Sequence, residues 1–317
     1  SSCKKTDFAE SYTDPSKIAV SSVEKQFSGF VNSNLGYIMP GYWNYFVVQR
    51  ITNNRYTQSV GWSNATGQYI PGGGAVSDHW NSYYNFLSQY KELVKINKAL
   101  SPADQAERRI FMIAATIYFY DYTQKMVDVH GDLPWSGAGM LSANGGDYLA
   151  SLPKYDKAQD IYTKMLDDLK AFSTELNSLT IPAAIQTAFN TQDFILKGNK
   201  THWTRYCNSL RLRMLTRVSG STELGARAAS EIAAMAAAPA TFPLVSSNAE
   251  NVQINVFSLN TPVAGSNFQG GLEDWNGNLA GKTMIDHMVT NGDPRLPVLF
   301  EPGTAAGTTY RGIDQMA

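Results

Sequence analysis

The chain has 317 residues, 43% of them hydrophobic, and its 26 basic side chains nearly balance its 27 acidic ones. This length and composition allow a sizeable buried core, in one large domain or two ordinary ones. No cluster of lysines or arginines supplies the basic patch of a nucleic-acid binder, and no apolar stretch approaches the ~20 residues that cross a bilayer. We therefore expect neither a nucleic-acid partner nor a membrane-spanning segment.

Apolar residues recur at helical spacing along much of the chain, after a polar tether over residues 1–17. Asp156 and Gln159 stand at the spacing of a capping box where one such helix begins. Tyr84 and Tyr118 lie 34 residues apart in consecutive helices, which is the period of tetratricopeptide helix pairs. We predict a mainly α fold of tetratricopeptide-like helical hairpins. The predicted helices cover residues 20–35, the region around 43–51, residues 78–99 and 103–129, a stretch from 154 onward, and residues 190–197, 201–218 and 222–238.

The sequence does not contain the common motifs for metal binding, phosphate binding or nucleophilic catalysis. Its four histidines are dispersed, and the GKT at residues 281–283 lacks the earlier glycine and the preceding strand of a phosphate-binding loop. We therefore predict no metal and no cofactor. A carboxylate pair for glycoside hydrolysis can come from anywhere in a chain, but no acidic residue here sits in a motif that proposes one.

Two short stretches contain the glycine, aspartate and proline residues typical of tight turns: GDLP at residues 131–134 and DPR at residues 293–295. The first must end a helix and turn the chain. In the second, Asp293 stands beside a rigid proline and is placed to accept local backbone hydrogen bonds. Both are predicted to be structural turns.

The two cysteines have different surroundings. Cys207 belongs to an apolar-periodic run and is expected to be a small buried core residue. Cys3 follows two serines and precedes two lysines. Small residues before a cysteine are typical of a lipoprotein cleavage site, after which acyl chains on the cysteine anchor the protein to a membrane. The alternative is an accidental free thiol in a terminal tail.

Several stretches follow one another in a characteristic order along the chain: SSC, the early Thr13-Asp14-Pro15, GDLPWSGAG, LPKYDKAQDIYTKMLDDLKAF, GNKTHWTRYCNSLRLRMLTRVSG and NGDPRLPVLF. Taken in order, these stretches resemble the SusD/RagB family of nutrient-binding outer-membrane lipoproteins. Members of that family are longer, so the chain resembles roughly their first two thirds and we expect its C-terminus to be incomplete.

The resemblance implies a single SusD-like domain over residues 18–317. In it, a helical scaffold over about 78–238 supports loop-rich parts at about 36–77 and 239–317. Such proteins sit on the extracellular face of the outer membrane, held by lipid alone, which here would be attached to Cys3. They cap a SusC-like TonB-dependent barrel, capture oligosaccharides or in some members oligopeptides, and are not enzymes.

Aromatic and amide side chains in the loops suit a sugar ligand, because sugar rings stack on flat aromatic faces while their hydroxyls need polar partners. Trp62 and Trp275 are our candidate stacking platforms, although both could instead fill small cores beneath the loops. The helix-face aromatics Trp80, Tyr83, Trp203 and Tyr206 are assigned to the core. The predicted ligand-binding residues are Asn54, Arg55, Trp62, Tyr69, Phe268 and Trp275.

Two other readings remain open at this point. A glycan-degrading enzyme of helical build would need an essential pair of acids in the loops. A helical-repeat scaffold for a protein partner would instead show a large apolar groove between hairpins. The sequence does not decide between a glycan and a peptide ligand.

Overall fold

The computed structural model describes residues 21–38, 41–42, 45, 54, 57–58, 73–253 and 279–314. The chain divides into two compact units, the first comprising Ser1–Ser33 and Tyr83–Gln253, the second Asn34–Ser82 and Ile254–Ala317. The elements of the first unit are α2 (Val23–Asn32), most of α5 (Gly73–Lys98), α6 (Pro102–Glu107), α7 (Arg109–His130), β1 (Leu133–Pro134), η2 (Leu149–Ser151), β2 (Tyr155–Asp156), α8 (Ala158–Ser178), α9 (Ala183–Gln192), α10 (Lys200–Val218), α11 (Gly225–Ala237) and η3 (Asn248–Glu250). Those of the second are α3 (Leu35–Ile38), the first turns of α5, α13 (Lys282–Thr290), α14 (Leu296–Leu299) and η5 (Thr304–Ala306).

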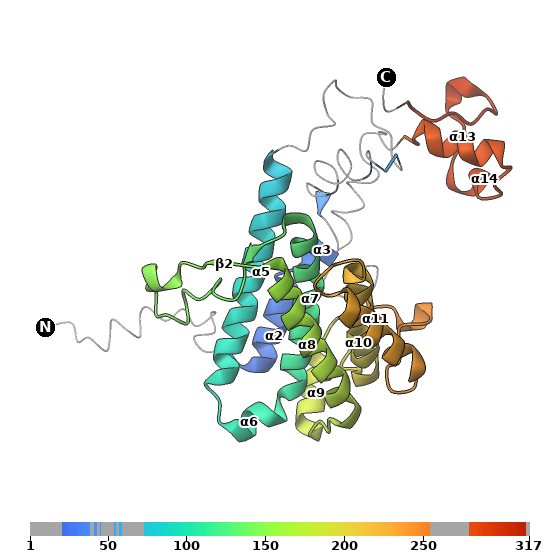
Figure 1. Cartoon of the computed structure of the whole chain (residues 1–317). Helices are drawn as coiled ribbons and strands as arrows, with labels where there is room; N and C mark the ends of the chain where they lie inside the picture. The colour runs from blue at the N-terminus through green and yellow to red at the C-terminus, as the bar shows by residue number, and fades with distance from the viewer. Residues whose placement is uncertain are drawn as a thin grey trace, which may run out of the picture. The chain divides into compact units, whose positions relative to one another are not determined.

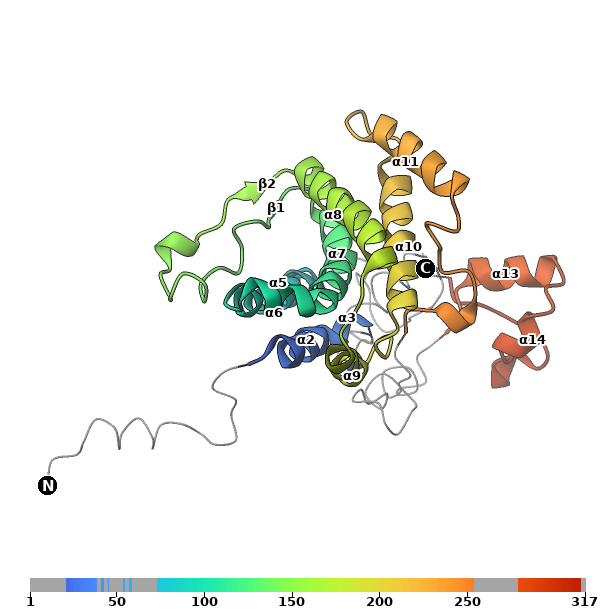
Figure 2. The same ribbon diagram turned by 90° about the horizontal axis from the view of Figure 1, so that it is seen from below.

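The prediction of a mainly helical protein is confirmed. Figures 1 and 2 show α7, α8 and α10 side by side in the first unit, with α11 against α10. The short β1 and β2 strands pair antiparallel, and the chain between them projects away from the helices in both views. None of the helices in the part of the chain that the structure describes is long and apolar enough to cross a membrane.

The core of the first unit is built around α7, in which residues 110–120 are all buried. A helix that is apolar all round must be covered all round, and α7 packs against α2, α8 and α10. Aromatic rings fill the space toward α2 and α5. Phe30 stacks on Phe86 with 4.4 Å between ring centroids, and Tyr90 stacks on Phe119 at 4.3 Å.

The helix predicted over residues 103–129 is interrupted, because α6 ends at Glu107 and α7 begins at Arg109, with Arg108 between them. Ser101 caps the start of α6, since its hydroxyl accepts from the backbone N–H of Asp104 at 3.2 Å. At the break, Nε of Arg108 donates to the carboxylate of Glu24 on α2 at 2.8 Å. The sequence pattern does not contain this long-range pair, which ties the interruption to α2.

The capping box predicted at Asp156 and Gln159 is wrong, since α8 begins only at Ala158. Asp156 instead lies in β2 and accepts from the backbone N–H groups of Trp135 and Ser136 at 3.1 and 2.7 Å. The start of α8 is capped by Asp132 of the GDLP turn, which accepts from the backbone N–H of Ala158 at 2.9 Å. The turn predicted there is confirmed, and it also provides the helix cap.

The helix predicted over residues 190–197 is also wrong, because α9 ends at Gln192. The fully buried carboxylate of Asp193 accepts from the backbone N–H groups of Ile195, Leu196 and Gly198 at 3.0–3.1 Å. The same carboxylate accepts from Nε1 of Trp203 at 2.7 Å. These bonds hold a turn that a helix would abolish, and Gly198 takes a positive φ of 71° within it.

The core assignments can be checked in the first unit and at the start of α5. Cys207 is free and fully buried, as predicted, and its thiol lies 3.4 Å from the carbonyl oxygen of Leu169. Tyr83, Trp203 and Tyr206 are buried in the core. Trp80 is only partly covered, so its assignment to the core was too strong. Cys3 lies outside the described residues.

Candidate functional site

Of the ligand-binding residues predicted from the sequence, only Asn54 lies among the described residues. Its backbone carbonyl accepts from the hydroxyl of Thr57 at 3.2 Å, which shapes a short turn. All six predicted positions fall in the sequence ranges of the second unit. The predictions that fall outside the described residues are Arg55, Trp62, Tyr69, Phe268 and Trp275.

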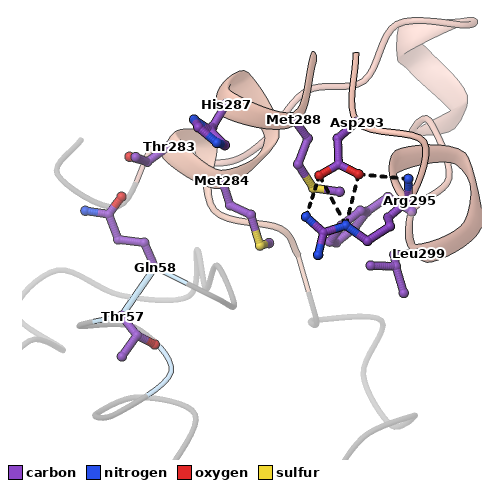
Figure 3. Close-up of a pocket in the computed structure, with 10 residues that line it drawn as sticks. Thr57, Gln58, Thr283, Met284, His287, Met288, Asp293, Arg295 and Leu299 are labelled. Atoms are coloured by element: carbon purple, nitrogen blue, oxygen red, sulfur yellow. Dashed lines mark hydrogen bonds and ion pairs between the residues drawn. The ribbon is translucent and has the colours of Figure 1, made fainter. Parts of the chain in front are cut away.

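A pocket of about 590 Å³ lies within the second unit, beside this turn (Figure 3). Its volume is in the range of small-molecule sites in proteins, about 300–1,000 Å³. Thr57 and Gln58 of the turn form one side. The remaining described lining residues are Thr283, Met284, His287 and Met288 of α13, followed by Asp293, Arg295, Leu299 and Phe300.

The start of α13 is fixed by close backbone contacts. The backbone N–H of Lys282 donates to the carbonyl of Ile313 at 2.8 Å, and the N–H of Ile313 donates to the carbonyl of Ala280 at the same distance. Gly281 packs so tightly against Gln58 that a Cβ there would collide with the Gln58 carbonyl oxygen. Only glycine allows this approach, which holds the 57–58 turn against the helix.

The base of the pocket is apolar. Met288 is 6% exposed and forms a small core with Ile285 and Leu296. Met284, one turn earlier on the same face of α13, packs against this core with Phe300. The thioether side chains therefore connect the core of the second unit to the pocket.

Opposite the turn, Asp293 and Arg295 form a charged pair. Oδ1 of Asp293 accepts from the backbone N–H of Arg295 at 2.9 Å, as the turn prediction required. Nη2 of Arg295 donates to Oδ2 at 2.5 Å, and Nε donates to Oδ1 at 2.9 Å. The side-chain hydrogen bond from Arg295, with its backbone N–H and positive charge, lowers the pKa of Asp293 to about 2. The pair therefore stays ionised at physiological pH, with 74% of the Arg295 side chain exposed.

The pocket joins an apolar base to polar groups. Figure 3 shows Met284 between the Gln58 side and the Asp293–Arg295 pair, so a ligand would meet an apolar base with polar groups on two sides. Within the described ranges, no group of His, Cys, Asp and Glu side chains could hold a metal ion. Asp293, the carboxylate of the pocket, is occupied by Arg295.

A second concavity, of about 790 Å³, lies between α7 and α10 in the first unit. Charged groups in and beside it form ion pairs that join α10 to α7. Nη2 of Arg213 lies 2.6 Å from Asp121, and Nε of Arg217 lies 3.1 Å from Asp128. Because the six ligand-binding positions predicted from the sequence fall in the second unit, we take its pocket as the candidate site.

Sequence reasoning missed the pocket residues that the structure brings together. The DPR stretch was assigned only to a turn, and α13 was considered only as part of a phosphate-binding motif. One feature of the sequence could have indicated the pocket. Met284 and Met288 stand at helical spacing, directly before the turn that carries Arg295. Nothing in the sequence indicated that Thr57 and Gln58 would reach the same helix.

The chain, with its helical first unit and its pocket-bearing second unit, is similar to several solved structures. A chitin-binding protein aligns with a TM-score of 0.66 and 22% identity over 92% of this chain and 60% of that chain. A chitin-binding SusD homologue from Flavobacterium johnsoniae aligns at 0.65 with 19% identity, over 91% of this chain and 57% of that one. A SusD-like protein from Bacteroides thetaiotaomicron VPI-5482 aligns at 0.62 with 17% identity, over 92% and 56%.

The fold is therefore that of SusD-like proteins. The family model SusD-like_2, described as "Starch-binding associating with outer membrane", matches residues 25–316. The chain belongs to this family, which confirms the resemblance drawn from its sequence motifs. No curated protein matches the chain by sequence. The chain spans about three-fifths of the length of the solved structures compared above.

Proposed function

We propose that this protein is a surface-exposed outer-membrane lipoprotein that captures a nutrient oligomer, in the first place an oligosaccharide, and delivers it to a SusC-like TonB-dependent transporter. The observation that carries the proposal is the SusD-like family match over residues 25–316. The two chitin-binding structures of similar fold support a glycan in preference to an oligopeptide. Both units are taken as parts of one SusD-like domain.

The pocket of the second unit agrees with this role. An apolar base beside a fixed ion pair offers both apolar contact and polar partners, and a sugar with its substituents needs both. The predicted residues Arg55, Trp62, Tyr69, Phe268 and Trp275 would extend this surface from the same unit of the chain. The protein would bind its ligand without chemical change and hold no cofactor.

The binding proposal is tested by calorimetric titration of the protein against a panel of oligosaccharides and a panel of short peptides, with a search for products in the same cell. We expect binding to oligosaccharides without turnover. Turnover would replace the proposal with a glycan hydrolase, and binding to peptides alone would change the nutrient class.

Replacing a predicted stacking residue gives a sharper test. Trp62→Ala should weaken oligosaccharide binding at least tenfold, about 1.4 kcal/mol, with an unchanged helical signal. Tyr148→Ala is the control, because Tyr148 is an aromatic residue of the first unit with 69% of its surface exposed. Equal affinity of wild type and Trp62→Ala would remove Trp62 from the site.

The anchoring and delivery roles have their own tests. Cys3→Ala in the complete protein should move it from the outer-membrane fraction to the soluble fraction, since a lipid on Cys3 is the proposed attachment. A tagged protein should copurify with a TonB-dependent barrel from gently solubilised outer membranes. Retention of Cys3→Ala in the membrane fraction would argue against the lipid anchor.

A further inference from the structure

The apolar lining of the pocket in the second unit differs from the usual surface for a plain sugar ring. Such a ring stacks best on a flat aromatic face. The described lining instead includes Met284, Met288 and Leu299, and its one aromatic residue is the partly buried Phe300. Methionine side chains are unbranched and deformable, so they close around a small irregular apolar group. A hydroxyl placed among them would lose its hydrogen bonds to water without replacement.

Polar groups flank this apolar surface on both sides. The side chains of Gln58 and Thr283 have no hydrogen-bond partner within the described residues and lie on the same side of Met284 in Figure 3. A primary amide both donates and accepts, and a hydroxyl can do either. On the other side, Asp293 holds Nε and Nη2 of Arg295, which leaves Nη1 as a donor on a largely exposed side chain. The pocket thus combines an apolar slot with amide-compatible donors and acceptors.

We propose that this pocket selects sugars that carry an N-acyl substituent, such as the acetamido group of an N-acetylhexosamine, over the same sugars with a hydroxyl at that position. The inference rests on the proposed function as a glycan-binding protein. The acyl methyl group packs on Met284 and Met288. The acyl carbonyl accepts from Gln58 or Arg295, and the N–H donates to Gln58 or Thr283.

A peptide also carries amide groups, but the described surroundings of the pocket do not favour one. Extended peptides are commonly bound by adding a strand to an open sheet edge. The pocket is lined by the helices α13 and α14 and by the 57–58 turn. The nearby bridge between Gly281 and Ile313 uses its hydrogen bonds within the unit. A short substituent projecting from a sugar ring needs no such edge.

The test is a titration of the whole chain with β-1,4-linked oligomers of equal length, built from N-acetylglucosamine, from glucosamine or from glucose. These ligands share a backbone and differ at the 2-position. We expect the N-acetylated oligomer to bind at least about tenfold more tightly than the glucose oligomer. The glucosamine oligomer should bind no better than the glucose oligomer, which separates an effect of the acyl group from one of nitrogen alone.

Substitutions then locate the selectivity. Met284→Ser should reduce the affinity ratio between the N-acetylated and glucose oligomers by about fivefold or more, mainly by weakening the binding of the N-acetylated oligomer. Met284→Leu keeps an apolar side chain and should retain the ratio. Met284 is suited to this test because it lies at the edge of the small core and not inside it. Val298→Ser is the control, since Val298 is 81% exposed, is next to Leu299 in the chain, and does not line the pocket.

The outcomes separate this inference from the proposed function. Equal affinity for the N-acetylated and glucose oligomers would overturn the inference and leave glycan capture intact. An unchanged affinity ratio in a folded Met284→Ser protein would also overturn it, because the acyl group would then be recognised elsewhere. Binding of peptides only, or of none of the ligands, would overturn the proposed function and the inference with it.

Discussion

The two units differ in where their informative polar groups lie: inside the scaffold in the first unit, and facing solvent at the pocket in the second. In the first unit, the buried carboxylate of Asp193 accepts hydrogen bonds from Trp203 and from the turn that follows it, and the buried Arg211 pairs with Glu231. In the second unit, the pocket exposes 74% of the Arg295 side chain and 63% of Leu299. Polar groups that are satisfied internally fix a structure, whereas groups left facing solvent are available to a ligand. The contrast distinguishes the scaffold from the binding surface.

Tyrosine hydroxyls in the first unit are also bonded internally, to carboxylates of neighbouring helices. Three hydroxyls donate to carboxylates on neighbouring helices at 2.5 Å, joining Tyr120 to Asp168, Tyr162 to Asp128 and Tyr206 to Asp121. Burial is the main reason why the pKa of Tyr120 and of Tyr162 is raised well above the ordinary value, so these hydroxyls remain donors at physiological pH. A change to such a group should therefore alter stability more than a change at the pocket.

The largest effect is expected at Asp193. Asp193→Ala leaves the indole N–H and several backbone N–H groups in a buried site without an acceptor, so the free energy of unfolding should fall by about 3–4 kcal/mol. Denaturant unfolding followed by circular dichroism measures the loss. The control Glu223→Gln changes an exposed carboxylate of the same unit and should stay within about 0.5 kcal/mol. Similar stability of the two variants would contradict the buried role of Asp193.

The next largest effect is expected at the buried ion pair. Nη2 of Arg211 lies 2.5 Å from Glu231, and only 2% of the Arg211 side chain is exposed. Glu231→Ala leaves that cation buried without its carboxylate, so the free energy of unfolding should fall by about 3 kcal/mol. Thermal and denaturant unfolding of the purified variants measure the change.

The double variant Arg211→Met/Glu231→Leu tests whether the unpaired buried cation causes that loss of stability. It removes both charges and fills the volume, so it should be more stable than Glu231→Ala alone. If the double variant were less stable than Glu231→Ala, the unpaired cation would not be the cause of the loss, and Arg211 would stabilise the fold through other contacts, such as the one over the Phe242 ring.

A smaller effect is expected at the cap of α8. Asp132→Ala removes the acceptor for the backbone N–H of Ala158 and should lower the melting temperature less than Asp193→Ala does. Lys157→Met breaks the exposed ion pair to Asp132 but keeps the cap, so it should have a weaker effect still. Equal losses in the two variants would assign the stability to the ion pair.

The smallest effect on stability is expected from the ionisation of Asp293. Its titration also tests the ion pair of the pocket directly. Its pKa is about 2 in the folded protein against an ordinary value of 3.8. The stabilisation from the pair with Arg295 is therefore complete above pH 3.8 and is lost as the pH falls toward 2. Titration of the Asp293 carboxyl carbon by nuclear magnetic resonance should give this low midpoint. In Arg295→Met the midpoint should move back toward the ordinary value, and an unshifted midpoint would mean that Arg295 is not its cause.

The sequence predicted most of the scaffold, because apolar residues at helical spacing report directly which face of a helix is buried. The errors occurred where a distant polar group decides the outcome. α8 is capped by Asp132 from the preceding turn, and α9 stops because Asp193 binds the turn after it. Neither contact leaves a periodic signal in the sequence.

The candidate site was less predictable for a related reason. Aromatic loop residues such as Trp62 could be proposed from composition, and these proposals remain predictions. The pocket itself depends on Gly281 letting the 57–58 turn approach α13, which joins parts of the chain more than two hundred residues apart. No local pattern encodes such a contact.

The buried carboxylate of Asp193 has a consequence for hydrogen exchange. Residues 195–198 form a turn between helices, and amides in such turns usually exchange with solvent in small local openings. Here the N–H groups of Ile195, Leu196 and Gly198 are all held by one carboxylate that also binds the core indole of Trp203. They cannot open without releasing that indole, so they should exchange as slowly as the core of α10. In its dynamics, this turn belongs to the most stable part of the scaffold.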